Sequence, residues 1–222
     1  PSTDEKIKYR PFLVKEEKIL LIALESGESE DIINAVKDIV TECTYGKVDL
    51  GTLPMFDVEY IFLNIRAKSV GEVSTLRLLC PDDKETYVNV DVDLSEIQVN
   101  VGEEHNPKIE LTKEMGMIMG YPNIDSMTNT GITEINATNM LDVISSCILQ
   151  IYDKKGEEVY ETKDQTKKEL TEFIESLNTQ QFQKVQQFFD TMPKLKHAVE
   201  LENPKTGVKS KVVLQGLNDF FA

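Results

Sequence analysis

Apolar residues recur every three to four positions in three segments of the first 71 residues, a spacing typical of amphipathic α-helices. The predicted helices cover residues 13–26, 29–40 and 54–71. Gly27 follows the first, at a position where helix ends favour glycine. Glu30 and Asp31 lie in the first turn of the second, where the helix dipole stabilises acidic side chains. The pattern therefore predicts an N-terminal helical layer.

Beyond residue 73, apolar and polar residues alternate, as they do in half-buried β-strands. Residues 74–80 and 86–94 flank a Pro-Asp-Asp-Lys turn and predict a β-hairpin. Further short strands are predicted at 6–10, 97–101, 108–111 and 115–121. The polar, turn-rich residues 123–133 predict a loop or linker.

Helical spacing returns in the last third of the chain, over residues 136–152, 166–177 and 179–192. A second hairpin is predicted from strands at 197–201 and 209–214, joined by a turn at 203–207. Separate blocks of helices and antiparallel strands predict an α+β fold. We expect one domain over 1–222, with 123–133 as the place where it would divide into 1–122 and 134–222.

The charge balance narrows the range of partners. The chain has 24 basic and 39 acidic residues and a net charge of -15, which repels nucleic acid and anionic membranes. Its longest apolar run, 19–24, is far shorter than the roughly 18 residues of a membrane span. Three widely spaced cysteines are typical of free thiols in a reducing cytoplasm. The start has neither a Met nor a signal-peptide layout, so we expect residues upstream.

Catalytic motifs are missing from the sequence, so we expect neither enzyme activity nor a cofactor. The two histidines, His105 and His197, lie in an acidic loop and at a strand start, where structural roles are commoner than catalysis. Asp91 and Asp93 fall on one face of a predicted strand and could bind a cation. A cation-dependent hydrolase is therefore one alternative, and a general intracellular adaptor or scaffold is another.

Several segments, taken together and in order, resemble the T-even-type bacteriophage baseplate protein family. Within it the sequence is most similar to baseplate hub assembly proteins of T-even-like and cyanobacterial myophages. The matching segments are residues 10–21, 65–72, 90–94, 173–177, 181–185 and 216–221. The resemblance implies a protein that binds tail hub and baseplate proteins in the cytoplasm of the infected bacterium. It leaves open whether the protein stays in the virion as a hub subunit or leaves as an assembly chaperone.

Relatives in this family carry a Cys-x-x-Cys at each hairpin turn, four thiolates suited to a structural zinc ion. This sequence has Cys80 and Asp83 at the first turn, and Asn203 and Thr206 at the second. The resemblance therefore implies a zinc-ribbon-like pair of hairpins without metal, held by polar side chains and turn hydrogen bonds, with Gly207 at positive φ.

Large apolar residues at the end of the chain must pack on their own domain or on a partner. We predict a partner-binding surface made of Leu217, Phe220 and Phe221, with Tyr9 and Phe12 from the start of the chain. Removal of the residues after Gly216 would then weaken binding without unfolding the protein.

Overall fold

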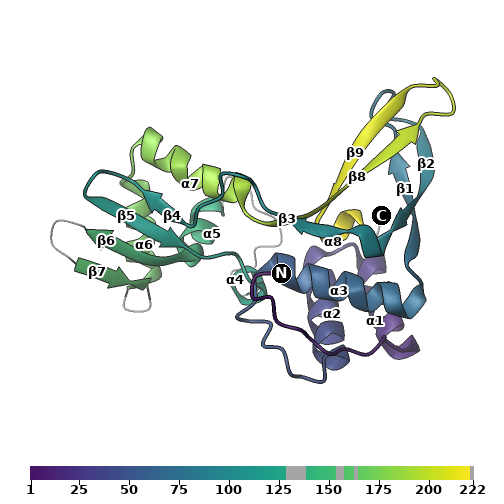
Figure 1. Cartoon of the computed structure of the whole chain (residues 1–222), viewed down its shortest axis with the longest axis horizontal. Helices are drawn as coiled ribbons and strands as arrows, with labels where there is room; N and C mark the ends of the chain where they lie inside the picture. Colours follow the sequence, from purple (N-terminus) through teal and green to yellow (C-terminus); the bar gives the residue numbers. More distant parts are fainter. Residues whose placement is uncertain (129–138, 154–157, 163–164, 221–222) are drawn as a thin grey trace. The chain divides into compact units, whose positions relative to one another are not determined.

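The computed structural model describes residues 1–128, 139–153, 158–162 and 165–220 (Figure 1). The chain forms two compact units. The first contains residues 1–50, 56–100 and 193–222, and the second contains residues 51–55 and 101–192. Of the expected loop at 123–133, residues Ile124–Thr128 form helix α4 in the second unit, and the remainder from 129 lies outside the described residues.

The helical layer predicted for the N-terminal part is confirmed in the first unit. Its three helices are α1 (Val14–Ser26), α2 (Ser29–Cys43) and α3 (Met55–Val70). Gly27 ends α1 with φ 71°, the left-handed conformation that a glycine adopts without strain. The apolar stripe of α2 is buried along its length, from Ile33 to Cys43, and this burial holds the layer together.

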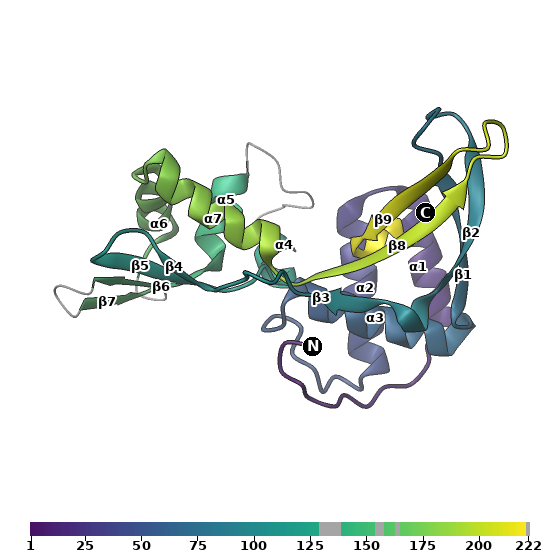
Figure 2. The ribbon, with the colours of Figure 1, turned by 45° about the horizontal axis from the view of Figure 1, so that its top comes forward.

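Both predicted hairpins are present in the first unit, where they lie side by side (Figures 1 and 2). Each strand pair is antiparallel, and the short strand β3 adds to the far side of β8. The elements are β1 (Val73–Leu79), β2 (Tyr87–Asp93), the 3-10 turn η1 (Leu94–Glu96), β3 (Gln98–Asn100), β8 (Lys194–Glu202), β9 (Lys209–Gln215) and the short helix α8 (Gly216–Asp219). The α+β class is therefore confirmed.

The core of the first unit brings the inward faces of the two hairpins together with α3 and α8. Alternation along β1 buries Leu76 and Leu78 and leaves their neighbours exposed or half-buried, as the period of a strand requires. The remaining buried side chains of this core come from α3, β2, η1, β8 and β9, and from the residues that directly follow β1, η1 and α8; they are Leu63, Ala67, Cys80, Val92, Leu94, Ile97, Leu195, Val199, Leu201, Leu214 and Phe220.

The second unit is a four-stranded antiparallel sheet with strand order β4-β5-β6-β7, packed with helices. Its elements are β4 (Lys108–Glu110), β5 (Met115–Met119), α4, α5 (Met140–Cys147), β6 (Ile148–Asp153), β7 (Glu158–Glu161), α6 (Lys167–Glu175) and α7 (Thr179–Thr191). The capping box predicted at Thr166 and Glu169 is confirmed, because each backbone N–H donates to the other side chain.

Two of the elements predicted from the sequence are wrong. The helix expected over 136–152 ends at Cys147 in the described residues, and Ile148–Asp153 form β6 between β5 and β7. The apolar residues of this segment fit the spacing of a helix and also that of a strand. The backbone hydrogen bonds that β6 makes to β5 and β7 decide in favour of the strand. Residues 6–10 form no strand; instead the Arg10 N–H donates to the carbonyl oxygen of Cys43, at 2.9 Å.

Gly116 in β5 lies where the sheet leaves no room for a side chain. A Cβ there would lie 2.6 Å from the Ile109 carbonyl oxygen and closer still to the Tyr152 hydroxyl. We expect Gly116→Ala to lower the free energy of unfolding by about 2 kcal/mol, through overpacking. The control is Gly120→Ala, whose Cβ would lie nearest to the Leu149 side chain, at 3.1 Å, and not to backbone atoms. Urea denaturation that shows equal stability for both variants would contradict this packing.

Candidate functional site: the paired hairpin turns

The turns of the two hairpins meet at the carboxylate of Asp82. The Asn203 side-chain amide donates to both oxygens of Asp82, at 3.0 and 3.1 Å. The Thr206 hydroxyl donates to Asp82 Oδ2, at 2.6 Å. These bonds join residues 121 and 124 positions apart in the sequence, so they connect the tip of one hairpin directly to the tip of the other.

Hydrogen bonds within each turn give it a defined shape. In the first, Asp83 Oδ1 accepts from the backbone N–H groups of Glu85 and Thr86, at 3.1 and 3.0 Å. The Thr86 hydroxyl donates to the other oxygen of Asp83, and the Cys80 N–H donates to the Thr86 carbonyl oxygen. Asp83 therefore organises its own turn, and Asp82 makes the hydrogen bonds to the other. The bonds of Asp83 to Thr86, and to a smaller extent an interaction with Asn203, lower the pKa of Asp83.

The second turn depends on Asn203 and on a glycine. Asn203 Oδ1 accepts from the Lys205 N–H at 2.9 Å, an Asx turn, while its carbonyl oxygen accepts from the Gly207 N–H at 2.8 Å. Gly207 has φ 72°, which confirms the predicted positive φ. Because its oxygen holds this turn and its amide group binds Asp82, Asn203 uses both ends of its side chain.

The four positions that the resemblance singled out do come together, and the pairing of the hairpins is confirmed. Cys80 is fully buried, Asp83 holds the first turn, and Asn203 and Thr206 bind Asp82. Sequence reasoning did not assign Asp82 this role. The available signal was its place in an Asp-Asp pair, where one carboxylate can serve its own turn and the other a neighbour.

The electrostatics of the turns favour hydrogen bonding over metal ligation. Hydrogen bonds from Thr206 and Asn203 lower the pKa of Asp82, and those from Thr86 lower the pKa of Asp83, so both are charged at neutral pH. Burial, with these two carboxylates beside it, raises the pKa of the Cys80 thiol and keeps it protonated. Among the described residues, no three His, Cys, Asp or Glu side chains gather as a metal site would require.

Two members of the predicted partner-binding surface belong instead to the core. Phe220 is fully buried and Phe12 is 8% exposed, so the exposure predicted for them is wrong. The Phe220 carbonyl oxygen accepts from Arg66, at 2.9 Å, and the Phe12 N–H donates to the Ser69 hydroxyl. Tyr9 is half-buried. The side chain of Leu217 and all of Phe221 lie outside the described residues.

Each carboxylate of the alternative cation site has a protein partner. Asp91 accepts a hydrogen bond from the Thr75 hydroxyl, at 2.6 Å. Asp93 caps the following 3-10 turn by accepting from the N–H and hydroxyl of Ser95, at 2.9 and 2.6 Å. Their positions on β2 are therefore explained by local structure, and the hydrolase alternative gains no support from them.

His105 is held between two hydroxyl groups. Its Nδ1 lies 3.1 Å from Thr191 Oγ1 and its Nε2 lies 2.9 Å from the Tyr121 hydroxyl. Because the Thr191 hydroxyl donates to the Gln187 carbonyl oxygen, Nδ1 carries the proton and Nε2 accepts. The ring also contacts Phe188, and burial lowers the pKa of His105. The histidine therefore ties its loop to α7 as a structural residue.

The linked tips expose apolar side chains. Leu79 and Tyr87 end β1 and begin β2 as a cross-strand pair, and Val208 precedes β9; they are 40%, 52% and 44% exposed. We call these three exposed residues, two at the tip of the first hairpin and one at the tip of the second, the tip patch. The Arg77 guanidinium lies 4.5 Å from the centre of the Tyr87 ring and orients it. An aromatic side chain on a braced support is typical of a protein-binding surface.

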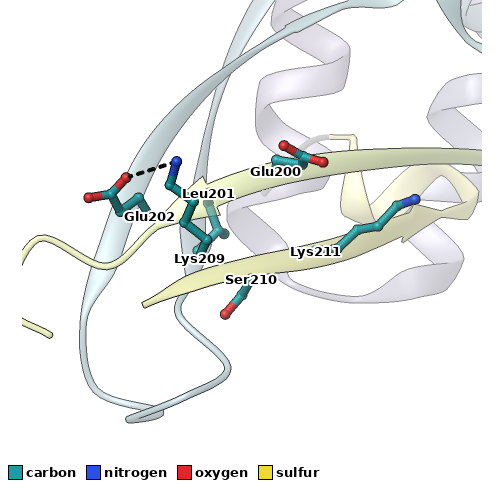
Figure 3. A pocket seen from close by; sticks show the side chains of 6 residues that line it. All are labelled: Glu200, Leu201, Glu202, Lys209, Ser210 and Lys211. Atoms are coloured by element: carbon teal, nitrogen blue, oxygen red, sulfur yellow. Dashed lines mark ion pairs between the residues drawn. The ribbon is translucent and has the colours of Figure 1, made fainter. Parts of the chain in front are cut away.

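The β8–β9 hairpin also lines an open pocket of about 440 Å³ below its tip (Figure 3). Its acidic side chains, Glu200 and Glu202, come from β8 and its basic ones, Lys209 and Lys211, come from β9. Lys209 pairs with Glu202 at 3.8 Å. The six lining residues are Glu200, Leu201, Glu202, Lys209, Ser210 and Lys211. None of them forms a nucleophile–base pair, so the pocket offers no catalytic arrangement.

These features define an α+β protein in which two hairpins are joined at their turns by side chains. The family model described as T4 bacteriophage base plate protein matches residues 1–222, the whole chain. The chain therefore belongs to this family and is a phage baseplate protein, which implies binding to other baseplate proteins. No curated protein and no solved structure matches it. No helix in the described residues is long and apolar enough to cross a membrane.

The link between the tips can be tested with Asp82→Ala, Thr206→Val and the double variant. We expect faster hydrogen exchange, on the order of fivefold, at the Cys80 and Asn203 amides, whose bonds close the two turns. Because both substitutions remove the same hydrogen bond, between Thr206 and Asp82, the amides of the double variant should exchange little faster than those of Asp82→Ala alone. The control is Asp91→Asn, which lies on the same hairpin. Additive effects of the two single changes would show that the tips are not coupled.

Proposed function

We propose that this protein helps to assemble the baseplate hub of a contractile phage tail by binding hub proteins, without catalysing a reaction. The observation that carries the proposal is the family match over the whole chain. The resemblance of its segments to hub assembly proteins adds the location within the baseplate. The hydrogen-bonded carboxylates of β2 and the protonated thiol of Cys80 agree with a role in binding.

Between a permanent subunit and an assembly chaperone, the surface favours the chaperone. Permanent interfaces tend to be large and apolar. The net charge of -15 favours solubility and a partner with a basic surface, and the tip patch is only three side chains wide. Assembly would take place in the cytoplasm of the infected bacterium. A hub subunit that stays in the virion is the second candidate, and the family's description as a base plate protein supports it.

The tip patch is the surface that we assign to this binding. It combines Tyr87, an aromatic residue of the kind that dominates interface energetics, with Leu79 and Val208. Because Asp82 fixes the tips to each other, little conformational freedom is lost when a partner binds. The braced hairpins therefore present the patch in one arrangement.

Affinity capture from phage-infected cells tests the proposal. The full-length tagged protein should enrich hub proteins, and a Tyr87→Ala, Val208→Ser variant should enrich about tenfold less, the equivalent of 1.4 kcal/mol. Val213→Ser is the matched control, since Val213 is 53% exposed on β9 but lies opposite Ala198, away from the tip. Equal capture by both variants would overturn the assignment to the tip patch. If wild-type protein captured no tail protein, the proposed function would be overturned as well.

Mass spectrometry of purified mature virions separates the two candidates. The chaperone predicts hub proteins in the captured material but no copy of this protein in the virion. Its presence in virions, at a fixed ratio to hub proteins, would establish the permanent subunit instead.

A further inference from the structure

Helix α1 has an apolar face that the described part of the chain does not cover. Its buried residues are Glu16, Leu20 and Ala23, which lie on one side. On the opposite side Val14, Leu21 and Ile22 are 79%, 53% and 57% exposed. A helix that is apolar on two sides is normally buried on both, which indicates that something covers the second side.

The charges on this exposed side are arranged in opposite halves of the helix. Lys18 lies in the first half and Glu25 in the second, on the same side as Val14 and Leu21. Lys15, also in the first half, already pairs within the chain, with Glu16 at 3.3 Å and with Glu42 at 3.9 Å. Lys18 and Glu25 carry opposite charges, although the chain as a whole has a net charge of -15. The face is therefore a place where two copies of this acidic chain can approach without net repulsion.

A wholly acidic or a wholly basic partner would fit this face poorly. An acidic partner would face Glu25, and a basic one would face Lys18, so each would place like charges together. A second copy of α1, turned end for end, places its acidic half against the basic half of the first. The pattern is thus complementary to itself, as a two-fold symmetric interface requires.

We propose that α1 is a contact between two copies of this chain, which pair antiparallel about a two-fold axis near residue 20. In this arrangement Leu21 of each copy lies beside the axis, against Leu21 and Ile22 of the other. Lys18 then points toward Glu25 of the second copy, and this attraction forms twice. This pairing goes beyond the proposed function and does not depend on it.

The length of the helix limits the strength of the pairing. Thirteen residues span about 20 Å, so the two faces bury less area than a typical stable complex. We therefore expect a reversible dimer with a dissociation constant on the order of 10 µM.

Sedimentation velocity of the full-length protein, from about 1 to 200 µM around that constant, tests the pairing. Wild-type protein should pass from monomer to dimer, and Leu21→Glu should stay monomeric. Because Leu21 is 53% exposed, the variant should keep the wild-type circular dichroism spectrum and melting temperature. Val213→Glu, equally exposed on β9, is the control and should dimerise normally. A monomer at all concentrations, or a dimer that Leu21→Glu leaves intact, would overturn the proposal.

A charge exchange provides a second test that does not remove apolar surface. Lys18→Glu and Glu25→Lys should each weaken dimerisation at least fivefold, because like charges then face each other. An equimolar mixture of the two variants should form a heterodimer more tightly than either forms a homodimer, since residues 18 and 25 are again opposite in sign. A mixture that associates no better than the separate variants would exclude the antiparallel arrangement.

Discussion

Replacement of Phe220 by Ala will lower the free energy of unfolding by about 4 kcal/mol, the cost of emptying a fully buried aromatic site. The ring packs in the core formed by α3 and the two hairpins. Its backbone is fixed as well, because Arg66 donates to the Phe220 carbonyl oxygen and also to the Ser74 hydroxyl. Phe220 and Arg66 together thus connect the hairpins to helix α3.

The measurement is chemical denaturation of Phe220→Ala beside Tyr160→Ala, a control at an aromatic residue that is 45% exposed. We expect the control to stay within about 1 kcal/mol of wild type. Truncation after Gly216 should then destabilise the first unit and not act only on partner binding. Wild-type stability of Phe220→Ala would show that the residue is not part of the core and would restore it as a candidate contact.

Replacement of Glu16 by Ala is the second change of large effect, with an expected loss of about 3 kcal/mol. Glu16 is 2% exposed, and its Oε1 lies 2.8 Å from Nη2 of Arg10. Its Oε2 accepts from the Leu13 N–H at 2.7 Å, so the carboxylate caps α1 and anchors the preceding segment. Without it, Arg10 loses its ion pair and the Leu13 N–H loses its acceptor. Glu17→Ala, at a half-exposed position in the same turn, is the control.

Glu16 also predicts how stability changes with pH. Burial by itself would raise its pKa, but hydrogen bonds from Arg10 and Leu13 lower the pKa to about 2, from an ordinary value of 4.5. Because the folded pKa is the lower one, the stabilisation is complete above pH 4.5 and is lost as the pH falls toward 2. Denaturation between pH 2 and 7 should show a smaller loss for Glu16→Gln. An identical pH profile for wild type and variant would contradict the ion pair.

Local patterns were enough to predict α1, α2, α3, α6 and α7 and the two hairpins of the first unit. Alternation in 86–94 and the capping pair Thr166 and Glu169 are properties of neighbouring residues, and both were confirmed. The spacing of apolar residues failed at Ile148, where helix and strand patterns overlap and the pairing of β6 with β5 and β7 decides. Strand pairing of this kind joins segments that are distant in the sequence, so the local pattern of apolar residues does not predict it.

The candidate site was predicted only in part, for a related reason. The resemblance brought Cys80, Asp83, Asn203 and Thr206 together, but it did not show that Asp82 makes the link. Which of two adjacent carboxylates points across depends on the shape of the turn, here set by the bonds of Asp83 to Thr86. The choice between packing on the chain and packing on a partner was likewise open for Phe220 until its burial was known.

The most direct test of a role in hub assembly is electron microscopy of tails from cells infected by phage that lack this gene. We expect baseplate precursors without a complete hub, few or no tails, and a loss of infectious particles that a plasmid copy of the gene restores. The Tyr87→Ala, Val208→Ser copy should restore far fewer than the Val213→Ser copy. Normal tails and a normal yield of infectious phage without the gene would contradict a role in hub assembly.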